Sequence, residues 1–176
     1  NTPLQLAQDS RRIEAPPRSY AGHRARVNFA FDQLAGLPAM DGPQFVYAHI
    51  ISPPPPFVFN ASGSPVEPPR AYSVDDGSDY DGSWAEYRAG YAAQVQYVNQ
   101  RVEEMVRAIL ARSADPPVII IQGDHGPGGR LDWDSPDRTC LRERTPILLA
   151  YYLPGGGERL LYPEISPVNS FRVVLN

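Results

Sequence analysis

The sequence predicts an α/β fold, a sheet-centred three-layer sandwich, from the order of its apolar patterns. The run Val118–Ile121 is apolar on both faces of a strand, which is typical of an interior strand covered by helices. A long amphipathic pattern over residues 84–112 precedes it and predicts a covering helix. Apolar runs at residues 44–51 and 146–153 predict two further strands. Because strand, helix and strand in this order normally form a right-handed parallel crossover, we expect the strands at 44–51 and 118–121 to be parallel.

The composition is that of an ordinary globular domain. The 176 residues are enough for one domain with a core, and the net charge of -4 indicates no nucleic-acid partner. Cys140 is the single cysteine, so the chain has no internal disulfide, and we expect this thiol to be inert. No apolar stretch reaches the length of a membrane span. Because the chain begins at Asn1 without a methionine and ends inside a predicted helix, we expect it to be a piece of a longer protein.

The first predicted helix covers residues 23–37. Its apolar residues recur at i, i+4 and i+7, which is helical spacing, and they are Val27, Phe31 and Leu34. We expect His23, at the polar start of this helix, to be exposed to solvent. The polar, proline-interrupted residues 1–22 before it predict a loop or tail.

A proline run, Pro53–Pro56, follows the predicted strand at 44–51. It cannot continue a central strand, because four prolines supply no N–H donors. Polyproline segments also act as ligands for aromatic grooves. Because this run lies between apolar segments, the sequence favours a rigid, ordered connection over an exposed ligand.

The long predicted helix begins at a capping box, Ser83–Glu86, after an acidic loop. The loop acids are Asp75, Asp76, Asp79 and Asp81. They lack the twelve-residue order and terminal glutamate of a calcium-binding EF-hand, so we interpret them as solvated. The apolar stripe of the helix predicts packing against the sheet and comprises Trp84, Tyr87, Tyr91, Val95, Val98, Val102, Met105, Ile109 and Leu110.

The C-terminal third contains a polar loop and a short predicted helix. Arg142 and Arg144 in the loop could hold an anionic substrate, although exposed loop arginines are commonly just solvated. Ser166 and Pro167 have the residue types of an N-cap and a first helical position. The predicted apolar face of the last helix consists of Val168, Phe171 and Leu175.

Asp124 and His125 follow the apolar strand directly and form the candidate site. Open α/β folds bind ligands where such strands leave the sheet. A carboxylate and an imidazole together suit zinc or manganese, although a strand followed by a polar turn would have the same sequence. His49 ends the predicted strand at 44–51, so a parallel arrangement would bring it to the same edge. The glycines around the pair leave the backbone conformationally free, and they are Gly123, Gly126, Gly128 and Gly129.

Residues 45–53, 118–126 and 145–154 together resemble the C-terminal half of a sulfatase-like domain of the alkaline phosphatase superfamily. The similarity is greatest to its membrane-anchored branch, which includes lipoteichoic acid synthases and phosphoethanolamine transferases. It extends from about Val27 to Asn176, and Asp-His-Gly after an apolar strand is its most specific part. The resemblance implies an alkaline phosphatase-like fold, of which residues 23–176 would be the C-terminal part.

The resemblance also implies an activity and a location. In this family a nucleophile attacks phosphorus or sulfur at a bound metal. Asp124 and His125 resemble the metal ligands, and His49 resembles a catalytic histidine that contacts the substrate or a second metal. Zinc or manganese is the expected metal, with calcium or magnesium as alternatives. The implied partners are a phospho- or sulfo-ester substrate and the missing N-terminal half, in a membrane-anchored protein that acts outside the cytoplasm.

Two departures from the family pattern suggest an alternative. The second histidine of the segment that begins at His49 would stand at position 54, where this chain has Pro54, which can neither ligate a metal nor transfer a proton. The nucleophile and the remaining acidic ligand would come from the N-terminal half. We therefore expect the chain to be inactive alone, and a degenerate sulfatase-like domain with a binding or scaffold role is the second hypothesis.

Overall fold

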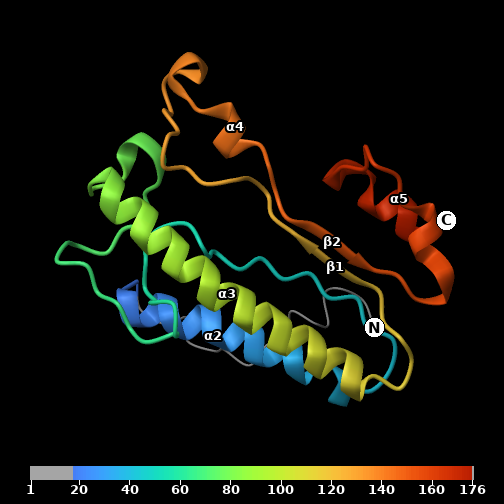
Figure 1. The fold of residues 1–176 in the computed structure, drawn as a ribbon. Helices are drawn as coiled ribbons and strands as arrows, with labels where there is room; N and C mark the ends of the chain where they lie inside the picture. The colour runs from blue at the N-terminus through green and yellow to red at the C-terminus, as the bar shows by residue number, and fades with distance from the viewer. Residues whose placement is uncertain (1–17, 176) are drawn as a thin grey trace, which may run out of the picture.

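Two long helices, α2 (Tyr20–Gly36) and α3 (Trp84–Arg112), pack together in the computed structural model, which describes residues 18–175 (Figure 1). The helix predicted over residues 23–37 is confirmed and begins three residues earlier, because the side chain of Ser19 accepts a hydrogen bond from the Gly22 amide. The predicted loop over residues 1–22 lies mostly outside the described residues, and its last three residues belong to α2.

The boundaries predicted for α3 are confirmed, but its predicted packing partner is wrong. Ser83 and Glu86 form both hydrogen bonds of the capping box. The apolar stripe, however, packs against α2 and the segment after the proline run, not against a sheet. The buried cluster consists of Val27, Phe31, Val58, Phe59 and Met105. Amphipathic spacing selects the buried face of a helix and leaves the identity of its neighbour open.

The proline run is an ordered connection, as predicted. Phe57 and Phe59 have exposed fractions of 5% and 1%, so the segment is not an exposed ligand. The side chain of Gln94 on α3 is fully buried beneath it. Its Oε1 atom accepts hydrogen bonds from the amides of Val58 and Phe59 at 2.8 and 3.2 Å. Its Nε2 atom donates to the carbonyl oxygens of Pro53, Pro54 and Pro56.

The sheet of the described residues has two strands, β1 (Ile119–Gln122) and β2 (Leu149–Tyr152). They are antiparallel, with Ile119 opposite Tyr152. The strand predicted at 44–51 is not formed, since these residues pair with no strand within residues 18–175. An extended run needs a hydrogen-bonded neighbour to become a strand, and here Phe45 and Tyr47 remain about 80% exposed. The predicted parallel crossover is therefore absent, and the three-layer sandwich stays a prediction.

Two expectations about buried residues are wrong. His23 has an exposed fraction of only 3%, because the segment before the proline run and Tyr72 cover it. Its Nε2 atom lies 2.9 Å from the carbonyl oxygen of Ile51, and burial lowers the pKa of the imidazole. In the last helix, α5 (Ser170–Leu175), the buried residues are Ser170 and Val173 in place of the predicted face. The helix is preceded by a 3-10 turn, whose three residues per turn rotate the face that a uniform α-helix would present.

Short elements fill the connections. They are the 3-10 helices η1 (Leu37–Ala39), η2 (Gly77–Asp79), η3 (Pro136–Arg138), η4 (Pro154–Leu160) and η5 (Pro167–Asn169), and the single helical turn α4 (Leu141–Arg144). Figure 1 shows α4 above the N-terminal end of α3 and α5 near β2. A hydrogen bond of 2.7 Å between the hydroxyls of Tyr151 and Ser170 connects α5 to β2.

Candidate metal and substrate site

The Asp124–His125 pair lies in the turn that follows β1. Strand pairing continues one residue past the strand, since the Gly123 amide donates to the Leu148 carbonyl at 2.9 Å. The Asp124 Oδ1 atom then accepts a hydrogen bond from the His125 amide at 3.0 Å, which orients the carboxylate over the turn. The Asp124 side chain is 67% exposed and that of His125 is 33% exposed, so both can be reached by a ligand.

The two atoms of Asp124 and His125 that could bind a metal lie close together. His125 Nδ1 lies 3.0 Å from the Gly126 carbonyl oxygen, and because a carbonyl only accepts, a hydrogen bond there requires the proton on Nδ1. In the neutral ring, Nε2 then presents a lone pair at 3.5 Å from the Asp124 Oδ2 atom. Two ligands of one tetrahedral zinc lie about 3.3 Å apart, because zinc bonds to nitrogen and oxygen are about 2.0–2.1 Å long. The pair therefore fits two positions around one cation.

The pair does not complete a metal centre by itself. Within residues 18–175, no group of three or more His, Cys, Asp or Glu side chains could hold a metal ion. Catalytic zinc sites usually have three protein ligands. Any metal held at Asp124 and His125 therefore needs at least one further donor from outside the described residues or from the substrate.

The predicted substrate-binding arginines differ in their surroundings. Arg142 is exposed on α4. Arg144, at the end of the same turn, is directed inward: its Nη1 atom donates to the Gly126 carbonyl at 2.9 Å and lies 3.7 Å from the Asp76 Oδ2 atom. The side chains of Arg144 and Asp76 are only 17% and 12% exposed. The backbone carbonyl of Arg144 also accepts from the Gly126 amide at 2.7 Å, so both ends of the residue contact the turn.

Asp76 is the residue of this region that sequence reasoning missed, since it was expected to be solvated like its acidic neighbours. Its Oδ1 atom accepts hydrogen bonds from the Tyr87 hydroxyl at 2.8 Å and from the Gly77 amide at 2.9 Å. The Tyr87 hydroxyl in turn accepts from the Gly128 amide at 2.8 Å. Burial, followed by the charge of Asp76, raises the pKa of Tyr87 strongly, so the phenol stays protonated and continues to donate. No signal in the sequence distinguishes Asp76 from Asp75.

The glycines of the turn permit close approach and do not adopt left-handed conformations. None of the four near the pair has a positive φ, unlike Gly77 in the neighbouring loop. A Cβ atom on Gly128 would overlap the carboxylate of Asp76, and one on Gly126 would overlap the Glu143 carbonyl. These two positions therefore need glycine for packing, not for backbone freedom.

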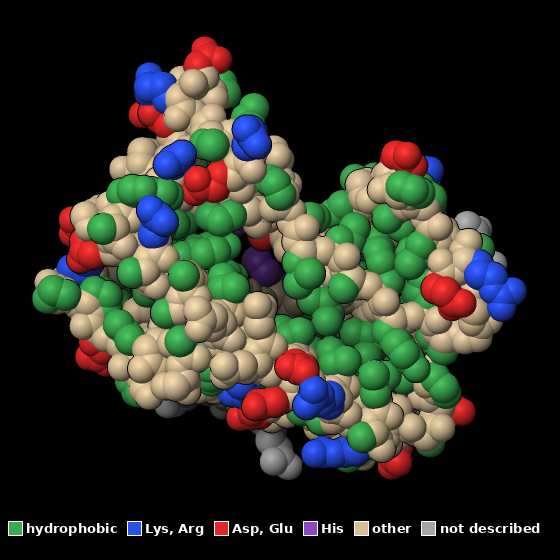
Figure 2. Space-filling model, in the orientation of Figure 1, with side chains coloured by type: hydrophobic (Ala, Val, Ile, Leu, Met, Phe, Trp, Pro, Cys, Tyr) green, Lys and Arg blue, Asp and Glu red, His purple; other side chains and the backbone are tan. Residues whose placement is uncertain are grey.

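His49 is exposed, in the irregular segment that was predicted to be a strand. Among the described residues, no hydrogen bond or ion pair joins His49 to Asp124 or His125. Figure 2 shows hydrophobic side chains gathered on both sides of a central hollow on this face of the molecule. The catalytic role of His49 stays a prediction.

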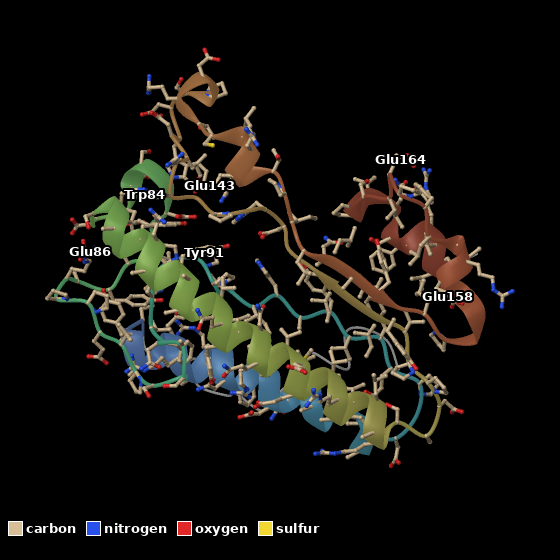
Figure 3. All side chains as sticks on the ribbon, in the orientation of Figure 1. Trp84, Glu86, Tyr91, Glu143, Glu158 and Glu164 are labelled. Atoms are coloured by element: carbon tan, nitrogen blue, oxygen red, sulfur yellow. The ribbon has the colours of Figure 1, made fainter. Side chains whose placement is uncertain are left out.

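An apolar groove of about 510 Å³ runs along the first turns of α3 and reaches the turn at Pro127. Three aromatic rings stack along it, with centroid separations of 6.0 Å between Trp84 and Tyr87 and between Tyr87 and Tyr91. Figure 3 shows Trp84 and Tyr91 on α3, with Glu143 across from them. Its lining residues are Trp84, Ala85, Tyr87, Arg88, Ala89, Tyr91, Ala92, Pro127 and Glu143.

Comparison of the chain with protein-family models, with curated proteins and with solved structures gave no match. Of the helices in residues 18–175, none has the length and hydropathy needed to cross a membrane.

Proposed function

We propose that the chain is the C-terminal part of a metal-dependent phospho- or sulfo-ester hydrolase or headgroup transferase, related to the sulfatase-like domains of the alkaline phosphatase superfamily. The observation that carries the proposal is the convergence of Asp124 Oδ2 and His125 Nε2 at 3.5 Å, at the end of a strand. Two acceptor atoms facing each other at this distance repel unless a cation or a proton lies between them. The resemblance in sequence supplies the superfamily, the location outside the cytoplasm and the membrane anchor of the whole protein.

The residues of the chain have separate roles in this proposal. A divalent cation, when bound, acts as a Lewis acid that activates the nucleophile and neutralises the oxygens of the transferred group. Asp124 and His125 hold this cation. His49 contacts the substrate or carries a proton, and exposed Arg142 is available to the anionic group of the ester. Arg144 is already bonded within the protein, so it is the less available of the two arginines.

The proposal includes the N-terminal half of the protein as the partner of this chain. A sheet of only two strands is marginal in water, because it buries little apolar surface. Large apolar side chains also remain exposed, among them Val118 and Leu148 beside the strands and Phe45 and Tyr47 in the irregular segment 44–51. Exposed apolar patches of this kind mark interaction sites. Strands and side chains from the upstream half would cover them and supply the nucleophile and the missing metal ligand.

Metal analysis of the whole protein tests the proposal. We expect zinc or manganese to copurify with the protein that includes its upstream half, and to be lost in Asp124→Ala and His125→Ala variants. We expect activity on a phosphate or sulfate ester to be lost together with the metal. A whole protein without bound metal and without esterase or transferase activity would refute the proposal.

Pro54 favours a second candidate, a degenerate domain with a binding or scaffold role. Its carbonyl oxygen accepts a hydrogen bond from Gln94 at 3.2 Å, so the residue is built into the fold of the connection. If the site is degenerate, Pro54→His should raise the metal affinity of the whole protein. Tight metal binding by the unmodified whole protein would contradict degeneracy.

A further inference from the structure

We propose that Asp76 and Arg144 are positioning residues, which hold the Asp124–His125 turn and fix the proton of His125 on Nδ1. As a consequence Nε2, the atom that faces Asp124, carries no proton in the neutral ring, and its lone pair is free to bind a metal. The first part of this inference stands on the geometry of the turn alone. Only its consequence for a metal rests on the proposed function.

The Gly126 carbonyl oxygen is the point at which the two residues act on His125. It accepts from Arg144 Nη1 at 2.9 Å and lies 3.0 Å from His125 Nδ1, so one oxygen serves two donors. The Gly126 amide donates to the Arg144 carbonyl at 2.7 Å. Both backbone groups of Gly126 are therefore held by Arg144, and its carbonyl oxygen lies within hydrogen-bonding distance of the imidazole. An imidazole keeps the tautomer that its second hydrogen bond selects.

Asp76 in turn holds Arg144. The carboxylate lies 3.7 Å from Arg144 Nη1, and its own position is fixed by hydrogen bonds from Tyr87 and from the Gly77 amide. Both members of the pair are largely buried, so the guanidinium is mostly shielded from solvent. Removal of one partner of such a pair leaves the other as an uncompensated charge. The geometry therefore couples the acidic loop before α3 to the imidazole after β1.

The acidic loop around Asp76 packs closely against the Asp124–His125 turn, which supports a specific contact between them. The absence of a side chain at Gly128 makes room for the Asp76 carboxylate, and the Gly128 amide donates to the same Tyr87 hydroxyl that bonds Asp76. Asp75, one residue earlier, is exposed and offers a matched control with the same charge.

Nitrogen-detected NMR of the imidazole in the 176-residue chain tests the proposal. At alkaline pH the wild-type chain should show His125 with its proton on Nδ1. Asp76→Asn keeps the shape of the side chain and removes its charge, and it should shift the tautomer toward Nε2–H, as should Arg144→Met. Arg144→Lys retains a donor for the Gly126 carbonyl and should restore part of the Nδ1–H population. Asp75→Asn should leave the tautomer unchanged.

Titration of the same variants, made in the whole protein with its upstream half, with Mn²⁺ tests the consequence for a metal. Asp76→Asn should weaken Mn²⁺ binding at His125 by about 10-fold or more, the usual effect of removing a residue that orients a metal ligand. If the whole protein with its upstream half does not bind Mn²⁺, the proposed function fails, while the tautomer still decides the positioning role. An unchanged tautomer in folded Asp76→Asn and Arg144→Met would overturn the positioning role, whatever the metal result.

Discussion

Replacement of Gln94 by alanine should be among the most destabilising single substitutions in the described chain. The side chain is fully buried on α3 and bonds to five backbone groups of the proline connection. Without it, the amides of Val58 and Phe59 lose their acceptor in a place that water does not reach, since these two residues have exposed fractions of 0% and 1%.

The magnitude follows from the number of groups left without a partner. Each buried donor without an acceptor costs about 1–3 kcal/mol. Two of the three proline carbonyls are only part-buried at Gln94 and can regain a partner in water. We therefore expect Gln94→Ala to lower the free energy of unfolding by about 3–5 kcal/mol, which includes a small cavity term.

Urea denaturation followed by circular dichroism measures this change. Gln96 lies two residues further along α3 and is exposed, so Gln96→Ala is the matched control. The control should change stability by less than about 0.5 kcal/mol. If Gln94→Ala and Gln96→Ala had the same unfolding midpoint, the role assigned to Gln94 would be wrong.

Three further predictions concern stability. Because burial lowers the pKa of His23, the folded chain favours the neutral ring. The neutral ring's contribution to the free energy of unfolding is complete above the ordinary histidine pKa of about 6.5 and is lost as the pH falls through the lower pKa of the folded chain. We therefore expect the free energy of unfolding to decline as the pH falls below the ordinary histidine pKa. The decline should be smaller in the His23→Gln variant. Gly90→Ala should lower the free energy of unfolding by about 1–3 kcal/mol, because the added Cβ atom would overlap the Phe57 ring. The added Cβ atom of Gly36→Ala would meet no neighbouring atom, so this control should be neutral or stabilising in thermal unfolding. Ser83→Ala removes half of the capping box and should cost about 1 kcal/mol in the same assay, and an unchanged midpoint would show that the cap is dispensable.

The helices could be predicted from the sequence because their signals are local. The capping box at Ser83 and the apolar spacing that follows it are complete within the segment itself. What α3 packs against depends on residues far away in the chain, and the sequence pattern does not contain that information. The buried Gln94 illustrates this limit, since a polar residue on a helix is normally expected to face solvent.

The candidate site was predictable only in part for the same reason. Asp124 and His125 are adjacent in sequence, so their convergence needs only a turn after a strand. Arg144 reaches the turn from α4 and Asp76 from the loop before α3, and their contact with each other could not be inferred from spacing. The predicted position of His49 depended on a strand that would need a hydrogen-bonded neighbour, and residues 18–175 supply none for it.

Binding of Mn²⁺ to the whole protein with its upstream half, followed residue by residue through paramagnetic broadening in NMR spectra, tests the central claim most directly. If Asp124 and His125 hold a divalent cation, substoichiometric Mn²⁺ should first broaden the signals of Gly123, Asp124 and His125. The same signals should stay sharp in the Asp124→Asn, His125→Gln double variant. Broadening that is equal in both proteins, or that is confined to the exposed acids of the loop before α3, would contradict a metal site at the end of β1.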